Sequence, residues 1–297
     1  MKSMRIATSI QARSREPPST QSPNYNTPTV YSRRGANLHL GISLIATTGG
    51  ASLTQLYSPS PAQASLLRFP ADSLQNRYIL VRAGESESES ENRVLTNPVA
   101  KTSMSNALSE NGRRQVIRET FAALNEIKAC DNGCWLWPSM TQNSYQTAEL
   151  LASLYGIGRN RIVPEFSKID ARGLGGFDGG RWSVVSEEVA AGDASSADWK
   201  PPASTTGTPN ESATEVLVRG RELLSLLETQ FFGETVLIIS PDSDNLSILQ
   251  AGVLGIDLRG HKNFELLPGR VRQLEVSTLE RDDSPRQIPC PNPPQCR

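Results

Sequence analysis

Short runs of consecutive apolar residues alternate along the chain with longer stretches in which apolar residues recur every three or four positions. The short runs predict buried strands, and the longer stretches predict amphipathic helices. Strands are expected at 78–81, 135–137, 235–240 and 271–276, and helices at 112–129, 146–155, 211–231 and 245–253. Continuous apolar strands are buried on both faces. The alternation therefore predicts an α/β three-layer sandwich, with a mostly parallel central sheet and helices on both faces.

Two segments follow neither pattern. Residues 181–209 are rich in Ser, Gly, Ala, Asp and Pro, which predicts a long loop inserted into the domain. Residues 281–297 contain several prolines and the last two cysteines, so they are expected to form an irregular tail. The folded domain is accordingly placed at 65–280.

The amino-terminal segment is typical of an import signal. Residues 1–37 are rich in Ser, Thr, Pro and Arg with almost no acids, as in a plastid transit peptide. The pair Arg33-Arg34, a mildly apolar stretch at 38–56 and the small-residue triplet Ala62-Gln63-Ala64 follow. This order predicts a two-stage signal over 1–64 that leads through the chloroplast to the thylakoid lumen, and the arginine pair favours the twin-arginine route over the Sec route. The alternative is a disordered tail with a chance Ala-Gln-Ala.

The charge distribution argues against a nucleic-acid partner. The chain has 30 Lys and Arg against 31 Asp and Glu, a net charge of −1. Residues 1–64 contain 6 of the basic residues and 1 acid, which leaves 24 basic and 30 acidic residues in 65–297, a net charge of −6. An acidic domain has no electrostatic attraction to nucleic acid or to an anionic membrane. No apolar run is long enough to predict a membrane span in the mature chain.

Candidate chemistry lies where two predicted strands end. The run at 78–81 continues into Arg82-Ala83-Gly84-Glu85-Ser86, and the run at 235–239 continues into Ser240-Pro241-Asp242. Sites in parallel sheets form at the carboxyl ends of strands. These motifs resemble the Arg-His-Gly-Glu and Ser-His-Gly motifs of the histidine phosphatase superfamily, the phosphoglycerate-mutase-like proteins. Further similar motifs follow in the same order at 108–115, 142–148, 175–179 and 210–212. The chain also resembles a plastid-targeted plant subgroup of that family.

The resemblance implies a phosphatase or phosphomutase fold whose catalytic residues have been replaced. The nucleophilic histidine of the family corresponds to Ala83, its second histidine to Pro241 and its second arginine to Asn143. A methyl group cannot attack phosphorus. The donor carboxylate corresponds to Ala171, next to Asp170. The only histidines in the chain are His39 and His261, so a two-histidine mechanism cannot be written for the mature chain.

Three functional hypotheses remain at this stage, and the third of them is a structural protein of the lumen that binds no ligand. In the first, the protein is not an enzyme and acts by binding, either a small anion at Arg82, Gly84 and Glu85 or a protein partner. In the second, it is a weak or metal-assisted phosphatase in which Asp178, Asp242 and Asp244, together with Glu85, hold a divalent cation. The structural alternative for Asp242 and Asp244 is that Ser243 or Asp244 caps the helix that follows. No cofactor is expected.

The acid/serine run at 85–91 is expected to be a solvated loop, whose acids would repel a phosphate ester from Arg82. A cation site, a basic partner or phosphorylation are its alternatives. His261 is expected to have no functional role. Four cysteines, Cys130, Cys134, Cys290 and Cys296, permit disulfides in an oxidising lumen. Three connectivities are open, and the spacing of Cys130 and Cys134 suits a local bridge, with a zinc site as the alternative.

Overall fold

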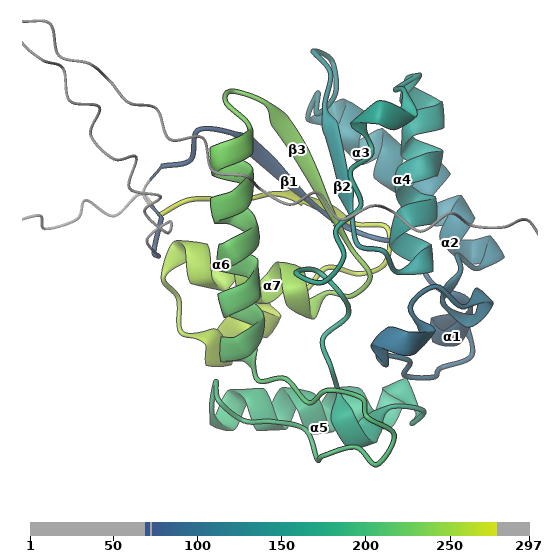
Figure 1. Cartoon of the computed structure of the whole chain (residues 1–297), viewed down its shortest axis with the longest axis vertical. Helices are drawn as coiled ribbons and strands as arrows, with labels where there is room; N and C mark the ends of the chain where they lie inside the picture. Colours follow the sequence, from purple (N-terminus) through teal and green to yellow (C-terminus); the bar gives the residue numbers. More distant parts are fainter. Residues whose placement is uncertain (1–68, 72, 278–297) are drawn as a thin grey trace, which may run out of the picture. The chain divides into compact units, whose positions relative to one another are not determined.

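The computed structural model describes residues 69–71 and 73–277, and Figure 1 shows a central sheet flanked by helices. The strands are β1 (Arg77–Arg82), β2 (Trp135–Pro138), β3 (Thr235–Ser240) and β4 (Val271–Gln273), in the order β2-β3-β1-β4. The first three are parallel, and β4 is antiparallel to β1. Arg82 is paired with Ser240, so β1 and β3 end side by side at the same edge of the sheet.

Seven α-helices occur in the part of the chain that the structure describes: α1 (Glu87–Ser90), α2 (Glu110–Gln115), α3 (Phe121–Glu126), α4 (Gln142–Tyr155), α5 (Trp182–Ser195), α6 (Ala213–Gln230) and α7 (Asp244–Leu254). A π-helical segment, η3 (Val116–Thr120), joins α2 to α3. Short 3₁₀ helices are η1 (Pro98–Ala100), η2 (Met104–Asn106), η4 (Arg159–Arg161), η5 (Gly175–Phe177) and η6 (Leu258–Phe264). No helix among the described residues is long and apolar enough to cross a membrane.

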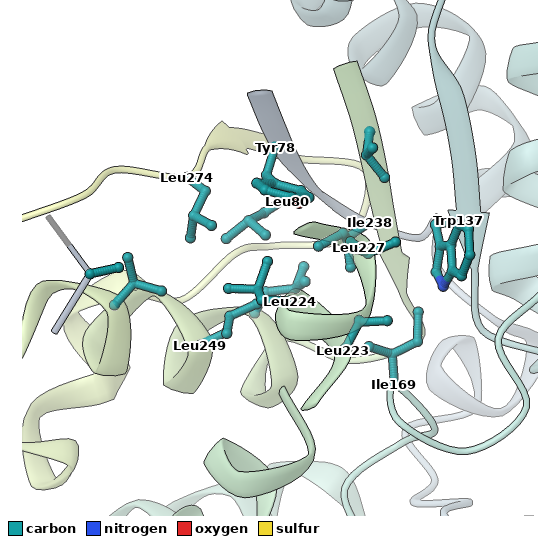
Figure 2. Packing of buried hydrophobic residues seen from close by; sticks show 14 of the residues in the cluster. Tyr78, Leu80, Trp137, Ile169, Leu223, Leu224, Leu227, Ile238, Leu249 and Leu274 are labelled. Atoms are coloured by element: carbon teal, nitrogen blue, oxygen red, sulfur yellow. The ribbon is translucent and has the colours of Figure 1, made fainter. Parts of the chain in front are cut away.

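Successive strand residues point to opposite faces of the sheet, so each strand contributes to two separate cores. On one face, Tyr78, Leu80 and Ile238 pack against leucines of α6 and α7, as Figure 2 shows. On the other face, Ile79, Val81 and Leu237 pack with residues of α3 and α4. The α/β three-layer sandwich predicted from the sequence is therefore confirmed.

The segment at 181–209 differs from its prediction as a loop. Its first half forms α5, because Val185 and Val189 lie one helical turn apart and bury themselves against Val94 and Leu174. The loop prediction was based on the Ser, Gly, Ala, Asp and Pro content of the segment, and it overlooked the helical spacing of these two valines. Residues 196–209 contain no helix or strand.

The predictions for the last strand, the cysteines and the two ends of the chain have different outcomes. The last strand is shorter than expected, since only 271–273 pair with β1. The local disulfide is confirmed: Cys130 and Cys134 are bonded, with 4.9 Å between their Cα atoms. The predicted signal at 1–64, the tail at 281–297 and the cysteines Cys290 and Cys296 lie outside the described residues.

Candidate functional site

A cavity of about 160 Å³ opens at the carboxyl ends of β1 and β3. Arg82 and Pro241 reach it from the strand ends, and Thr141 and Asn143 reach it from the beginning of α4. Further lining residues come from the α1 segment, from 93–96, from 171–174, from the beginning of α5 and from 262–268. The cavity lies at the sheet edge where the sequence placed the candidate chemistry.

Arg82 lies at this cavity but its charge is already neutralised. The side chain is 4% exposed, and its guanidinium donates to the carboxylate of Glu89. Its Nη1 also donates to the carbonyl of Ala83, at 3.3 Å. The candidate anion site is thus occupied by a carboxylate of the same chain.

Glu89 reaches Arg82 because the acid/serine run is not a solvated loop. Residues 87–90 form α1, and Ser86 begins it with a capping box. The Glu89 amide donates to Ser86 Oγ at 3.3 Å, and the Ser86 amide donates to Glu89 Oε2 at 2.8 Å. This reciprocal arrangement fixes the Glu89 side chain. The prediction of a solvated loop is wrong, because the spacing of Ser86 and Glu89 carries a helix-start signal that composition masks.

The three positions expected to have lost catalytic residues lie close together. Ala83 is completely buried, and its amide donates to the carbonyl of Ser240 at 2.9 Å. Asn143 Nδ2 donates to the carbonyl of Gly84 at 3.3 Å, so its amide is used within the loop. Pro241 follows β3 and lines the cavity. None of the described residues that line this cavity is a histidine.

Gly84 and Glu85, also proposed to bind an anion, do not line the cavity. The Gly84 amide donates to Thr147 Oγ1 at 3.3 Å, and the Glu85 amide donates to Gln115 Oε1 at 2.9 Å. A Cβ on Gly84 would lie 2.6 Å from the carbonyl oxygen of Gly112. The loop therefore lies so close to α2 and α4 that side chains of these two helices accept from the amides that an anion would need. Of the three residues expected to bind an anion, only Arg82 lines the cavity.

The proposed metal ligands do not converge either. Asp178 accepts from the amides of Thr96 and Asn97, at 2.6 and 3.2 Å. The Glu85 carboxylate accepts from Ser109 Oγ at 2.8 Å. Within 69–71 and 73–277 no group of three or more His, Cys, Asp or Glu side chains is arranged to hold a metal ion. Carboxylates spread over separate loops are each satisfied locally.

Asp242 and Asp244 lie at the cavity in different electrostatic states. Burial and the nearby charge of Asp244 raise the pKa of Asp242 above its ordinary value. Burial opposes ionisation of Asp244 as well, but Lys262 and Arg172 outweigh it and lower the pKa of Asp244. Asp242 Oδ1 accepts from the Asn245 amide at 3.0 Å, whereas Ser243 makes no side-chain cap. Asp242, rather than Ser243 or Asp244, thus satisfies the beginning of α7.

Comparison with known proteins decides the family. The profile of the histidine phosphatase superfamily (branch 1) matches residues 78–287. This chain belongs to the histidine phosphatase superfamily. Comparison of the sequence with curated proteins gives no match.

Solved structures show the same superfamily fold. Bacillus stearothermophilus YhfR is 20% identical, with a TM-score of 0.51 over 68% of this chain and 92% of that one. Mycobacterial glucosyl-3-phosphoglycerate phosphatase in complex with VO3 is also 20% identical, with a TM-score of 0.50 over 67% of this chain and 90% of that one. At this identity the likeness concerns the fold alone.

One buried polar cluster of this superfamily member could not be predicted from the sequence. Arg172 lines the cavity, is 1% exposed and donates through both terminal nitrogens to Asp193, at 2.7 and 2.8 Å. His261 lies 3.1 Å from Asp193 Oδ2 and 2.9 Å from Ser247 Oγ. These last three side chains have the residue types of a hydrolytic triad, but all are at most 1% exposed. Because no substrate reaches them, their arrangement is structural, and no local pattern links residues so far apart in the chain.

Proposed function

We propose that this histidine phosphatase superfamily member is catalytically degenerate and acts by binding a small ligand or a protein partner. The observation that carries the proposal is the pair of side chains at the adjacent ends of β1 and β3. Ala83 follows one strand and Pro241 follows the other. By resemblance these positions correspond to the two histidines of the family, and neither side chain can attack phosphorus or donate a proton to it.

The remaining histidine of the described chain does not replace them. His261 is completely buried and is engaged with Ser247 and Asp193. It does not line the cavity that contains Arg82. An imidazole must touch the reacting phosphoryl group to act as a nucleophile or general acid, so this arrangement supports a function without phosphoryl transfer.

The proposal predicts that the purified protein does not turn over phosphate monoesters, with or without Mg²⁺, Mn²⁺ or Ca²⁺. Removing a covalent nucleophile lowers kcat by up to about 10⁶-fold in a hydrolase. A panel of phosphate esters assayed for released phosphate measures this directly. Detection of a covalent phospho-adduct, or turnover at ordinary enzymatic rates, contradicts the proposal.

A triple variant tests in the same assay whether restoring the family's residue types restores phosphatase activity. Ala83→His, Asn143→Arg and Pro241→His together restore the residue types that the family resemblance implies, so they are expected to raise phosphatase activity above that of the unmodified protein. The matched control is His261→Gln, which alters the remaining histidine of the described chain and leaves the absence of activity unchanged.

The proposed place of action is the thylakoid lumen of the chloroplast. The two-stage pattern within residues 1–64 supports it, with the Arg33-Arg34 pair and the Ala62-Gln63-Ala64 triplet. The Cys130–Cys134 disulfide is compatible with it, because structural disulfides persist in oxidising compartments.

A further inference from the structure

The ionisable side chains that line the cavity balance one another. The basic ones are Arg82, Arg93, Arg172 and Lys262. The acidic ones are Glu89, Asp242, Asp244 and Glu265. A pocket that holds a phosphate ester presents an excess of positive charge and hydrogen-bond donors, and this lining has no such excess.

The basic groups are also paired within the protein. Arg82 contacts Glu89. Arg172 and Lys262 both contact Asp244, at 3.0 and 2.7 Å. Arg93 lies at the exposed rim, 3.7 Å from Glu91. An incoming anion would have to displace carboxylates that these cations already hold.

Glu89 is the decisive group because it covers Arg82, the cation at the end of β1. The Arg82 side chain is almost completely buried, so it needs a partner to offset the loss of water around its charge. Glu89 belongs to the same chain and is fixed by the Ser86 capping box, so its carboxylate faces Arg82 at a high effective concentration. An external phosphate has no such advantage.

The uncharged part of the lining combines polar side chains, such as those of Asn106 and Thr141, with apolar ones. Val94, Leu174, Trp182, Leu266 and Leu267 supply the apolar surface. The cavity volume of about 160 Å³ is similar to that of an engineered apolar cavity of about 150 Å³ that binds benzene in another protein. The space therefore suits a ligand with roughly one aromatic ring.

We infer that this cavity binds an uncharged, largely apolar small molecule of about one ring, with the Glu89 carboxylate permanently occupying the anion position at Arg82. The inference rests on the proposed non-catalytic function and assigns a ligand class to the same site. Such a site differs from a phosphate pocket in what drives binding. The ligand is held by the burial of apolar area, and the charged side chains of the lining are paired with one another.

Titration calorimetry of the whole protein with two probes, indole and inorganic phosphate, tests the inference. The unmodified protein is expected to bind indole and to show no phosphate binding at millimolar concentration. Glu89→Gln removes the charge on Arg82's partner, while the amide oxygen still accepts from Ser86 as in a capping box. This variant is expected to bind phosphate at least about tenfold more tightly, the change expected when one hydrogen bond to a charged group becomes available.

The matched control is Glu87→Gln, which removes the same charge from the exposed side of the same short helix, away from the cavity. It is expected to leave both affinities unchanged. Ala171→Phe places a ring in the cavity and is expected to abolish indole binding. Trp182→Ala, at a side chain that is 41% exposed and tolerant of truncation, is expected to weaken indole binding even where Ala171→Phe fails to fold.

Three results would overturn the inference: phosphate binding by the unmodified protein as tight as by Glu89→Gln, absence of indole binding, or indole binding that both cavity variants leave intact. These outcomes differ from failure of the proposed function. A protein that binds phosphate without hydrolysing it contradicts only the ligand class, whereas turnover of phosphate esters contradicts the absence of catalysis.

Discussion

At the scale of single residues, the buried Arg172 connects several separate segments of the molecule. Its guanidinium is held by Asp193 on α5 and Asp244 on α7, and His261 in η6 contacts the same Asp193. Each member comes from a different segment, so the cluster joins α5 and η6 to the end of the sheet that holds the cavity. A fully buried cation is tolerated only when its donors are satisfied.

Asp193→Asn is therefore expected to lower the free energy of unfolding by about 3 kcal/mol at neutral pH, since it leaves Arg172 buried without its bidentate partner. Urea denaturation measures the change. The matched control is Glu149→Gln, which breaks an exposed ion pair with Arg159 and is expected to change stability by less than about 1 kcal/mol. An equal effect of the two substitutions would contradict the structural role of the cluster.

The same variant has a defined pH dependence. Burial alone would raise the pKa of Asp193, but hydrogen bonds from Arg172 and His261 lower it below the ordinary value of 3.8. The ionised carboxylate thus stabilises the folded state fully above pH 3.8, and this contribution disappears as the pH falls through the lowered pKa. The stability difference between unmodified protein and Asp193→Asn should persist from pH 7 to 5 and narrow below pH 3.8.

At the scale of elements, α6 illustrates how an amphipathic helix is positioned on the sheet. Ser212 and Glu215 begin it with a capping box. Its leucines then divide by position: Leu223, Leu224 and Leu227 face the sheet and are completely buried, whereas Leu226 is 41% exposed. Figure 2 shows Leu224 and Leu227 beneath β1 and β3.

Leu224→Ala is expected to lower the free energy of unfolding by about 2–5 kcal/mol, because it leaves a cavity in the core between α6 and the sheet. Leu226→Ala removes the same atoms two positions along the helix and is expected to have a much smaller effect, since that side chain already contacts solvent. Thermal and urea unfolding compare the two. If Leu226→Ala proved as damaging as Leu224→Ala, the assigned face of α6 would be wrong.

At the scale of the whole molecule, the proposed import signal within 1–64 and the domain that follows it rest on different observations. The domain is defined by its sheet and two cores, whereas the signal is defined by composition and short motifs. The full chain with a carboxyl-terminal fluorescent tag is expected to accumulate inside thylakoids, protected from added protease, with its amino terminus at or near Ser65.

The arginine pair supplies the matched comparison for this experiment. Arg33→Lys combined with Arg34→Lys is expected to block transport into the lumen by the twin-arginine route, while Arg13→Lys combined with Arg15→Lys keeps the same charge and leaves transport unchanged. Recovery of the protein in the stroma with residues 1–64 retained would contradict the two-stage signal.

Much of the fold could be predicted because the strongest elements carry strong local patterns. The run at 235–240 and the helix over 213–230 are clear in the sequence, and both form nearly as predicted. Helix α5 was missed because its apolar face is narrow. Helix α1 was missed because its capping box is the one helix signal in a run of acids and serines that is otherwise typical of a loop. Arg82, Asn143 and Pro241 all line the cavity, whereas Asp178 and Glu85 do not.

Local patterns along the chain are enough to place the main strands and helices, and to show that Ala83 and Pro241 follow two strand ends, because periodicity and residue identity are local properties. Contacts in the folded molecule show that Glu89 neutralises Arg82, that helix side chains accept from the amides of Gly84 and Glu85, and that Arg172 is buried with Asp193. Hydrogen bonds and ion pairs act over a few ångströms in space. The chain brings such groups together from positions whose separation along the sequence carries no signal of their contact.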